Sequence, residues 1–276
     1  MSEHTENEEL QVTELSGNAI VLEAQERASI DIQINTAKRF PRVLSMVKKR
    51  MLEFATLDQE TAAACFYTLP ARRGGDGKAI MGPSARLAEI AVTCYGHIRA
   101  AARIISNDGK MITAQGVCHD LENNVSVAVE VKRRITTKDG RTFSDDMQVV
   151  AGNAACSIAL RNAVFKVVPM ALVKPVYEAS RKVAIGDAKT LASRRSDALS
   201  HFAKMGVSKE VVLTSLNLKS VEDITLEHLE HLIGLANAIK EGDTTIDEAF
   251  KPAAPDGATL SDMLKPKEGK KADAAP

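Results

Sequence analysis

The hydrophobic pattern of the chain changes its period near residue 97, and this change constrains the fold more than any other feature. Before it, apolar residues recur at the spacing of helices. After it they alternate with polar ones, most strictly at Val125, Val127, Val129 and Val131. Alternation of this kind is typical of a β-strand with one buried face. Strands are predicted over 97–106, over 111–120, and from Val125 onward.

Turn signals separate these strands and set their direction. The chain has Asn107-Asp108-Gly109 after the first strand, Glu122-Asn123-Asn124 after the second and Lys138-Asp139-Gly140 after the third. Tripeptides of this composition favour tight hairpins. A short fourth strand is expected over 141–145. The prediction is an antiparallel β-meander of three to four strands.

Helices are predicted on both sides of the meander. A helix should begin near Pro41, with Val43, Val47, Met51 and Phe54 on one stripe, followed by helices over 58–67 and 84–96. After the meander, an alanine-rich helix should run from about 147 to 168, where Pro169 stops it. Its small side chains allow it to pack closely on the sheet. The fold class predicted for the core is therefore α+β.

The rest of the chain divides by composition. We expect an acidic disordered leader over 1–30, a core over 31–186, a small all-α accessory domain over 187–250 and a disordered tail over 251–276. Within the tail, the short apolar motif from Leu260 to Leu264 is a candidate for docking on a partner.

Charge is balanced over the 276 residues, with 36 Lys+Arg and 36 Asp+Glu, but it is segregated along the chain. Residues 1–30 carry 1 basic and 7 acidic residues (net −6), 72–183 carry 17 and 10 (net +7), and 205–250 carry 3 and 9 (net −6). A basic centre between acidic flanks is typical of a polyanion-binding core. The alternative is that the basic residues simply lie on solvated faces.

Composition also bounds the cellular context. No apolar run reaches the roughly 20 residues of a membrane helix, and the acidic N-terminus lacks a signal-peptide pattern, so a cytoplasmic protein without membrane contact is expected. The four cysteines, Cys65, Cys94, Cys118 and Cys156, form no CxxC pair. Reduced and mostly buried thiols are predicted.

A search for enzyme motifs is largely negative. Lys78 ends a GGDGK sequence, but Arg72 and Ala79 stand where a Walker A phosphate loop needs Gly and Ser or Thr. No cofactor is predicted. Four acids near strand ends leave one catalytic alternative open, a metal-dependent nuclease that would use Asp120, Glu122, Asp145 or Asp146.

The positive signal is a set of basic residues around the predicted sheet. One cluster surrounds the hairpin that follows the third strand and comprises Lys132, Arg133, Arg134, Lys138 and Arg141. On the first strand, Arg99 and Arg103 share one face, and Lys132 and Arg134 share a face of the third. A second basic lining is predicted from the glycine-rich loop and the long helix, with Arg72, Arg73, Lys78, Arg161 and Lys166.

Aromatic residues are scarce, with 7 Phe, 3 Tyr and no Trp, so base stacking is not expected to supply most of the affinity. Contacts with the phosphate backbone would dominate. The predicted binding is independent of sequence and sensitive to salt.

The order of these elements carries a resemblance. The stretch ARRGGDGKAIMGPSARLAEIAVTCYGHI, the meander and VVAGNAACSIALRNAVFKVVP together resemble the single-strand annealing proteins of phage recombination systems, a group that includes Erf, RecT-like proteins and the Rad-type annealing mediators. Arg72 or Arg73 matches an arginine of the Rad-type core, Tyr95-Gly96 its aromatic-Gly pair, and Arg161 a basic residue of its long helix. The resemblance spans roughly residues 35–183.

This resemblance implies ATP-independent binding of single-stranded DNA and annealing of complementary strands in homologous recombination, by a homo-oligomeric ring or helical filament. It also implies that the C-terminal domain contacts an exonuclease or a host single-strand-binding protein. The family's long helix usually carries two or three adjacent basic residues, whereas Leu160 and Asn162 flank Arg161 here. Two other classes stay open, the nuclease above and a purely structural assembly protein.

Overall fold

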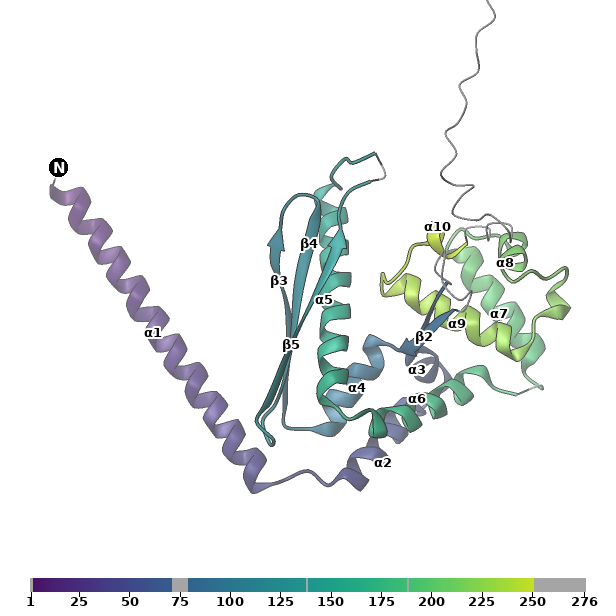
Figure 1. Cartoon of the computed structure of the whole chain (residues 1–276), viewed down its shortest axis with the longest axis horizontal. Helices are drawn as coiled ribbons and strands as arrows, with labels where there is room; N and C mark the ends of the chain where they lie inside the picture. Colours follow the sequence, from purple (N-terminus) through teal and green to yellow (C-terminus); the bar gives the residue numbers. More distant parts are fainter. Residues whose placement is uncertain (1, 71–78, 138, 188, 251–276) are drawn as a thin grey trace, which may run out of the picture.

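The computed structural model describes residues 2–70, 79–137, 139–187 and 189–250, and their side chains from residue 19 onward. The elements before the main sheet are α1 (Ser2–Arg39), α2 (Leu44–Ala55), α3 (Gln59–Ala64), β1 (Phe66–Leu69), β2 (Ile80–Pro83) and α4 (Ala85–Tyr95). The main sheet and its helix are β3 (Ile98–Asn107), β4 (Met111–Asp120), β5 (Val125–Arg134) and α5 (Asp145–Val167). Then follow α6 (Met170–Ile185), α7 (Leu191–Lys204), α8 (Lys209–Ser215), the 3-10 turn η1 (Val221–Asp223), α9 (Leu226–Lys240) and α10 (Ile246–Ala249). The described chain is α+β (Figure 1).

The main sheet is an antiparallel meander with the strand order β3-β4-β5, which confirms the predicted strands. Its turns lie where the sequence places them. The predicted fourth strand is reduced to one bridge between Thr136 and Thr142 in the hairpin after β5. This segment is too short to continue the ladder, and Ser144 directly precedes α5.

The long helix α5 covers one face of this sheet, as predicted from its alanine content (Figure 1). Ala155 and Ala159 are buried with Ile112 and Ala114 of the central strand in one apolar cluster. At Gly116 the approach is closest, because an added Cβ would lie 2.3 Å from the carbonyl carbon of Ala159. Only a strand residue without a side chain fits under the helix there.

A larger apolar cluster lies at one end of α5. It combines α2, α4, α5 and α6 and includes the buried residues Val47, Met51, Leu87, Val164 and Val176. The stripe predicted on the first helix is shifted, since Val43 and Phe54 are exposed while Val47, Met51 and Ala55 are buried. The shift follows from the start of α2 at Leu44, after an extended Val43.

A second, two-stranded sheet was not anticipated. β1 pairs antiparallel with β2 and takes over part of the segment predicted as helix 58–67, so that α3 ends at Ala64. α9 packs on this hairpin, and a Cβ at Gly234 would lie 2.1 Å from the Thr68 hydroxyl. Tertiary contact with a distant helix thus overrides the local helical pattern.

The C-terminal helices form a cluster of their own around Phe202, Val207, Val212, Leu232 and Leu235. Two of these helices begin at side-chain caps of the kind that Ser and Thr favour: the Ser208 hydroxyl accepts from the Val211 N–H, and the Thr225 hydroxyl accepts from the His228 N–H. α6 ends at Ile185 and α7 begins at Leu191, on either side of the boundary predicted at residue 186.

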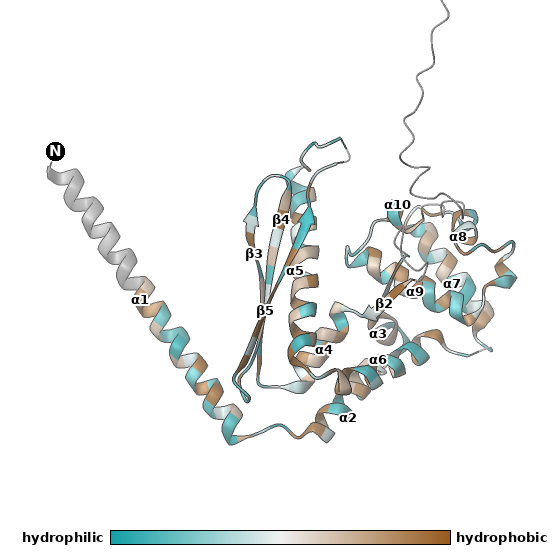
Figure 2. Ribbon diagram, viewed as in Figure 1, coloured by the Kyte–Doolittle hydropathy of each residue, from teal (hydrophilic) through white to brown (hydrophobic). Residues whose placement is uncertain are grey.

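The prediction of a disordered leader over 1–30 needs correction, since α1 is helical from Ser2 to Arg39. The segment contains no proline and a single glycine, Gly17, and is rich in residues that favour helix. From residue 19 onward most of its side chains are exposed, and the helix projects from the rest of the chain (Figures 1 and 2). It meets the body along its C-terminal half, where Glu26 and Gln33 contact Arg99 and Ala37 is buried.

In the described residues, no helix combines the length and apolar character needed to cross a membrane.

Candidate nucleic-acid interface

The two faces of the β3–β5 sheet differ in chemistry. Alternate residues of the central strand, including Ala114, Gly116 and Cys118, are buried against α5. Their neighbours point the other way and are less covered. We call this second set the open face. It consists of Arg99, Ala101, Arg103 and, after a bulge at Ile105, Ser106 of β3, Met111, Thr113, Gln115, Val117 and His119 of β4, and Ser126, Ala128, Glu130, Lys132 and Arg134 of β5.

Burial along β5 supports this assignment. Its open-face residues are all exposed, whereas Val127, Val129 and Val131, which alternate with them, are half-buried. The sequence predicts that Arg99 shares a face with Arg103, and Lys132 with Arg134. In the structure both pairs lie on the same face, which strand alternation alone does not determine.

The four cations form two rows. Arg99 and Arg103 lie on β3 and are separated by about 13 Å, whereas Lys132 and Arg134 lie on β5 and are separated by about 7 Å. The central strand contributes no Lys, Arg, Asp or Glu to this face, so an uncharged strip about 10 Å wide separates the rows. In the register, the β3 pair lies level with His119 and Gln115 of β4 and the β5 pair level with Thr113 and Met111, so the positive charge follows a diagonal across the neutral strip.

Few carboxylates neutralise these cations. Glu130 is the one acid among the open-face residues, and Glu26 of α1 approaches Arg99 with an N–O distance of 3.3 Å. The Arg99 guanidinium also donates to Gln33, at 3.3 Å. Within the described part of the chain, Arg103, Lys132 and Arg134 have no carboxylate within 4.0 Å. Three of the four charges are therefore available to a polyanion.

Two turns extend the basic surface at one end of the sheet. The Ile135 N–H donates to the Lys110 carbonyl oxygen at 2.9 Å, and the Thr142 hydroxyl donates to the Gly109 carbonyl oxygen at 2.9 Å. These bonds hold the β3–β4 turn against the hairpin that carries the exposed Arg141. Sequence reasoning missed Lys110, although its position beside the Asn107-Asp108-Gly109 turn was the signal that could have found it.

The basic run 132–134 is divided by strand alternation. Arg133 lies opposite Ile112, on the side of the sheet that α5 covers, and is half-buried. It is therefore not part of the open face. The predicted contact Lys138 lies outside the described residues.

The second basic lining is not assembled as predicted. Arg161 is buried and its guanidinium is 2.8 Å from the Asp243 carboxylate and 4.5 Å from the centre of the Tyr67 ring. The side chain thus joins α5 to the C-terminal helices and is removed from the set of DNA contacts. Lys166 is exposed in the last turn of α5, apart from the open face. Arg72, Arg73 and Lys78 lie outside the described residues.

The four acids of the nuclease alternative are not brought together. Asp120 accepts two hydrogen bonds from Arg42, at 2.6 and 2.7 Å, and Glu122 lies 3.2 Å from the same guanidinium. Asp145 and Asp146 begin α5 at the opposite end of the sheet, where acids favour a helix N-terminus (Figure 1). Among the described residues, no three His, Cys, Asp or Glu side chains are grouped so that they could hold a metal.

Arg42 also changes the electrostatics of Asp120. Burial alone would raise the pKa of this carboxyl, but its hydrogen bonds with Arg42 and Asn123 and the charge of Arg42 lower the pKa to about 2. Asp120 is therefore a partner in a buried ion pair. This pair fixes Arg42, which lies in the segment between α1 and α2, against the turn between β4 and β5.

The aromatic-Gly pair of the resemblance belongs to the same cluster. The Gly96 carbonyl accepts from Arg42 at 3.2 Å, and the Arg42 guanidinium lies 3.8 Å from the centre of the Tyr95 ring. Tyr67 and Tyr177 likewise lie beside Arg161 and Arg181. All three tyrosines of the chain thus contact arginines and none lies on the open face.

The thiols match their prediction. Cys65, Cys94 and Cys118 are buried, Cys156 is half-buried, and all four are free. Burial raises the pKa of Cys65 to about 12 and that of Cys118 to about 11. These groups are protonated, inert members of the core.

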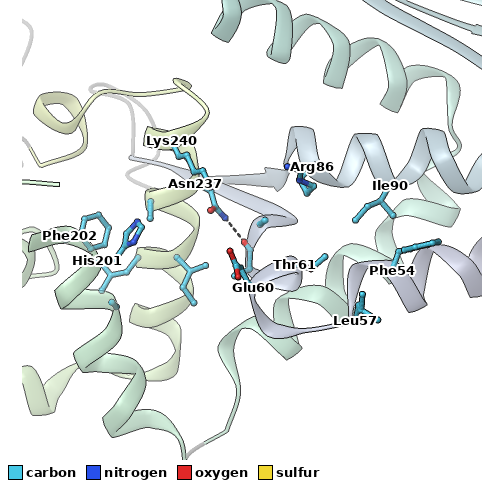
Figure 3. Close-up of a pocket in the computed structure, with 16 residues that line it drawn as sticks. Phe54, Leu57, Glu60, Thr61, Arg86, Ile90, His201, Phe202, Asn237 and Lys240 are labelled. Carbon is cyan, nitrogen blue, oxygen red and sulfur yellow. Dashed lines mark hydrogen bonds between the residues drawn. The ribbon is translucent and has the colours of Figure 1, made fainter. Parts of the chain in front are cut away.

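A groove between the core and the C-terminal helices is a second concave feature (Figure 3). It has a volume of about 710 Å³ and is walled by α2, α3 and α4 on one side and by α7 and α9 on the other. At its base the Asn237 amide donates to the carbonyl oxygens of Ala63 and Phe66, at 2.5 and 2.7 Å. Its lining is mainly apolar, so it differs in character from the open face.

Comparison with protein-family models, with curated proteins and with solved structures finds no match for this chain.

Proposed function

We propose that this protein binds single-stranded DNA on the open face and anneals complementary strands without ATP, in homologous recombination. The observation that carries the proposal is the pair of cation rows on β3 and β5, in which Arg103, Lys132 and Arg134 have no carboxylate partner within the described chain. The resemblance of the core to phage annealing proteins is consistent with it.

The physical route from this surface to annealing is short. Cations that neutralise phosphates reduce the repulsion between two complementary strands. A strand held extended along the sheet has already lost part of its conformational freedom, so pairing requires less further ordering. Because the open face carries no Phe, Tyr or Trp, the bases would find no large ring on the protein to stack against and would stay free to pair.

The proposal includes assembly and partners. A single sheet offers only about 33 Å of surface along a strand, so a homo-oligomeric ring or filament would be needed to hold a long strand. The segment 205–250, with net charge −6, would repel DNA and is assigned to contacts with an exonuclease or a host single-strand-binding protein.

The test is the rate at which two complementary oligonucleotides anneal, without ATP, across a salt series. Arg103→Ala with Lys132→Ala should weaken strand binding about equally for all sequences. It should reduce the slope of log K against log salt by about 1.4, because each lost phosphate contact removes about 0.7. Acceleration by the unmodified protein should fade with salt and leave the strands intact.

The matched control is Lys48→Ala with Lys209→Ala, which removes two exposed cations from α2 and α8. Its salt slope should equal that of the unmodified protein. Equal losses in both variants would show that binding follows net charge rather than the open face. Shortened strands would favour the nuclease alternative, and self-association without salt-dependent affinity would favour an assembly protein.

A further inference from the structure

The groove between the core and the C-terminal helices exposes apolar side chains that nothing in the described chain covers. Phe54 and Leu57 stand on its core side and are 45% and 73% exposed. Phe202 and Leu232 contribute to its opposite wall and are buried by the packing of α7 on α9. Figure 3 shows these walls facing one another across an open space.

The rim of the groove carries more basic than acidic side chains. Its titratable lining residues are Arg86, His201, Lys240 and one acid, Glu60 (Figure 3), and Arg86 also forms an ion pair with the exposed Glu89 of its own helix. Lys240 has no carboxylate within 4.0 Å among the described residues. The groove therefore fits an apolar segment that carries an acidic side chain.

The chain contains such a segment beyond its last described residue. Residues 251–276 follow Phe250, and their only large apolar side chains are Leu260, Met263 and Leu264. The spacing i, i+3, i+4 puts all three on one face of a helix. Thr259 and Asp262 have the spacing of a capping box, and Pro266 would end the helix two residues after Leu264.

The tail also starts beside the groove. The Phe250 ring packs edge-on against Phe202, with 5.3 Å between ring centres, and Phe202 lines the groove. Leu260 follows Phe250 by ten positions, and a chain of that length can span up to about 35 Å. The motif can therefore reach the groove of its own chain at a high effective concentration.

We propose that this groove is the docking site of the chain's own tail, with Leu260, Met263 and Leu264 inserted between the core helices and α7 and α9. Asp262 would face the basic rim. The docked tail would bridge the core and the C-terminal helices, and any other ligand of the groove would first have to displace it. This inference does not depend on DNA binding.

The first experiment places a photoreactive benzoylphenylalanine at Met263 of the full chain and maps the cross-links by mass spectrometry. We expect cross-links to groove segments 54–64, 198–202 or 232–240 of the same chain. Leu57→Glu should lower their yield at least fivefold, whereas Met46→Glu, which is equally an exposed apolar residue but outside the groove, should not. Cross-links to other surfaces, or an equal yield in Leu57→Glu, would overturn the proposal.

Mixing isotope-labelled and unlabelled chains identifies the donor of the tail. Cross-links within one chain support the proposal, and cross-links between labelled and unlabelled chains would assign the groove to a second copy instead.

A second measurement avoids the bulky probe. A fluorescent peptide of residues 255–268 should bind the variant Leu260→Asp with Leu264→Asp at least tenfold more tightly than the unmodified chain, whose own tail competes. Equal affinity for the two proteins, or no binding to either, would contradict docking in cis.

Discussion

At the scale of single residues, Arg42 joins segments that lie far apart in the sequence. It contacts Asp120, Glu122, the Gly96 carbonyl and the Tyr95 ring, and its side chain is 5% exposed. Its role has no signal in the sequence. Arg42 stands between Pro41 and an extended Val43, and its nearest bonded partner is 54 positions away.

Removing the Arg42 guanidinium should strongly destabilise the fold. Arg42→Ala is expected to lower the free energy of unfolding by about 3–5 kcal/mol, because Asp120 would remain buried without a cation. The control is Arg86→Ala, whose pair with Glu89 is exposed and should contribute less than about 1 kcal/mol. Urea unfolding of the two variants measures the difference, and similar losses would show that the buried pair has no special weight.

The same variant has a pH signature. In the folded protein the pKa of Asp120 is lowered to about 2, below the roughly 3.9 of an unfolded chain, so its contribution is complete above the unfolded pKa and is lost as the pH falls toward 2. Without Arg42 its hydrogen bond and charge no longer lower the pKa of Asp120, while the hydrogen bonds with Asn123 remain, so this pKa should rise. The fall in stability between about pH 4 and pH 2 should therefore be shallower in Arg42→Ala than in the unmodified protein.

At the contact between the sheet and α5, replacing two glycines by alanine should change stability in opposite directions. Gly116→Ala should destabilise the fold by about 1–3 kcal/mol, since its methyl group would meet the helix backbone at Ala159. Gly152→Ala should stabilise it by up to about 1 kcal/mol, because an alanine favours the helix and its Cβ would meet Ile104 and Ile112 at ordinary distances of 3.6 and 3.7 Å. Thermal unfolding of both variants checks the sign of each effect.

At the scale of elements, strand alternation gives β5 two chemically different faces. Arg134→Ala should weaken binding of single-stranded DNA and reduce its salt slope by about 0.7, while Arg133→Ala, on the side of α5, should leave the slope unchanged. Fluorescence anisotropy with one oligonucleotide across a salt series compares them. Equal slopes in both variants would place the binding surface elsewhere, with the hairpin tip as the next candidate.

The elements that the sequence predicts well are those with strong local patterns. The three strands of the meander, α5 and the caps at Ser208 and Thr225 all follow from periodicity and turn residues. β1 and β2 do not, because α9, which packs on their hairpin, lies more than 140 residues away. For the candidate site, the sequence identifies the cations of β3 and β5, but not that both pairs share a face, nor that Arg161 is buried.

At the scale of the whole molecule, the C-terminal helices are joined to the core by polar as well as apolar contacts. Arg161 binds Asp243, Arg181 binds Glu230, and the Asn237 amide bridges two carbonyls of the core. Burial raises the pKa of Glu241, whose carboxylate accepts from the Ala85 N–H at 3.4 Å. The accessory helices are therefore packed as part of one structure with the core.

Because the C-terminal helices and the core are packed together, breaking one contact between them should destabilise both. Asp243→Ala leaves Arg161 buried without a carboxylate and should lower the free energy of unfolding by about 3–5 kcal/mol. Hydrogen exchange should quicken first in α9 and β1, which meet at Gly234. Asp197→Ala, an exposed substitution on α7, should change stability by less than about 0.5 kcal/mol. Affinity for single-stranded DNA should stay within twofold in both, because neither variant touches the open face.

The contacts between tyrosines and arginines have a spectroscopic consequence. The chain has no tryptophan, and its three tyrosines contact Arg42, Arg161 and Arg181 rather than lying on the open face. The sheet surface that carries the cations is thus optically silent. An indole introduced at the exposed Ala128 would be the sole tryptophan of the molecule, and its emission would report on whatever covers that surface without a background to subtract.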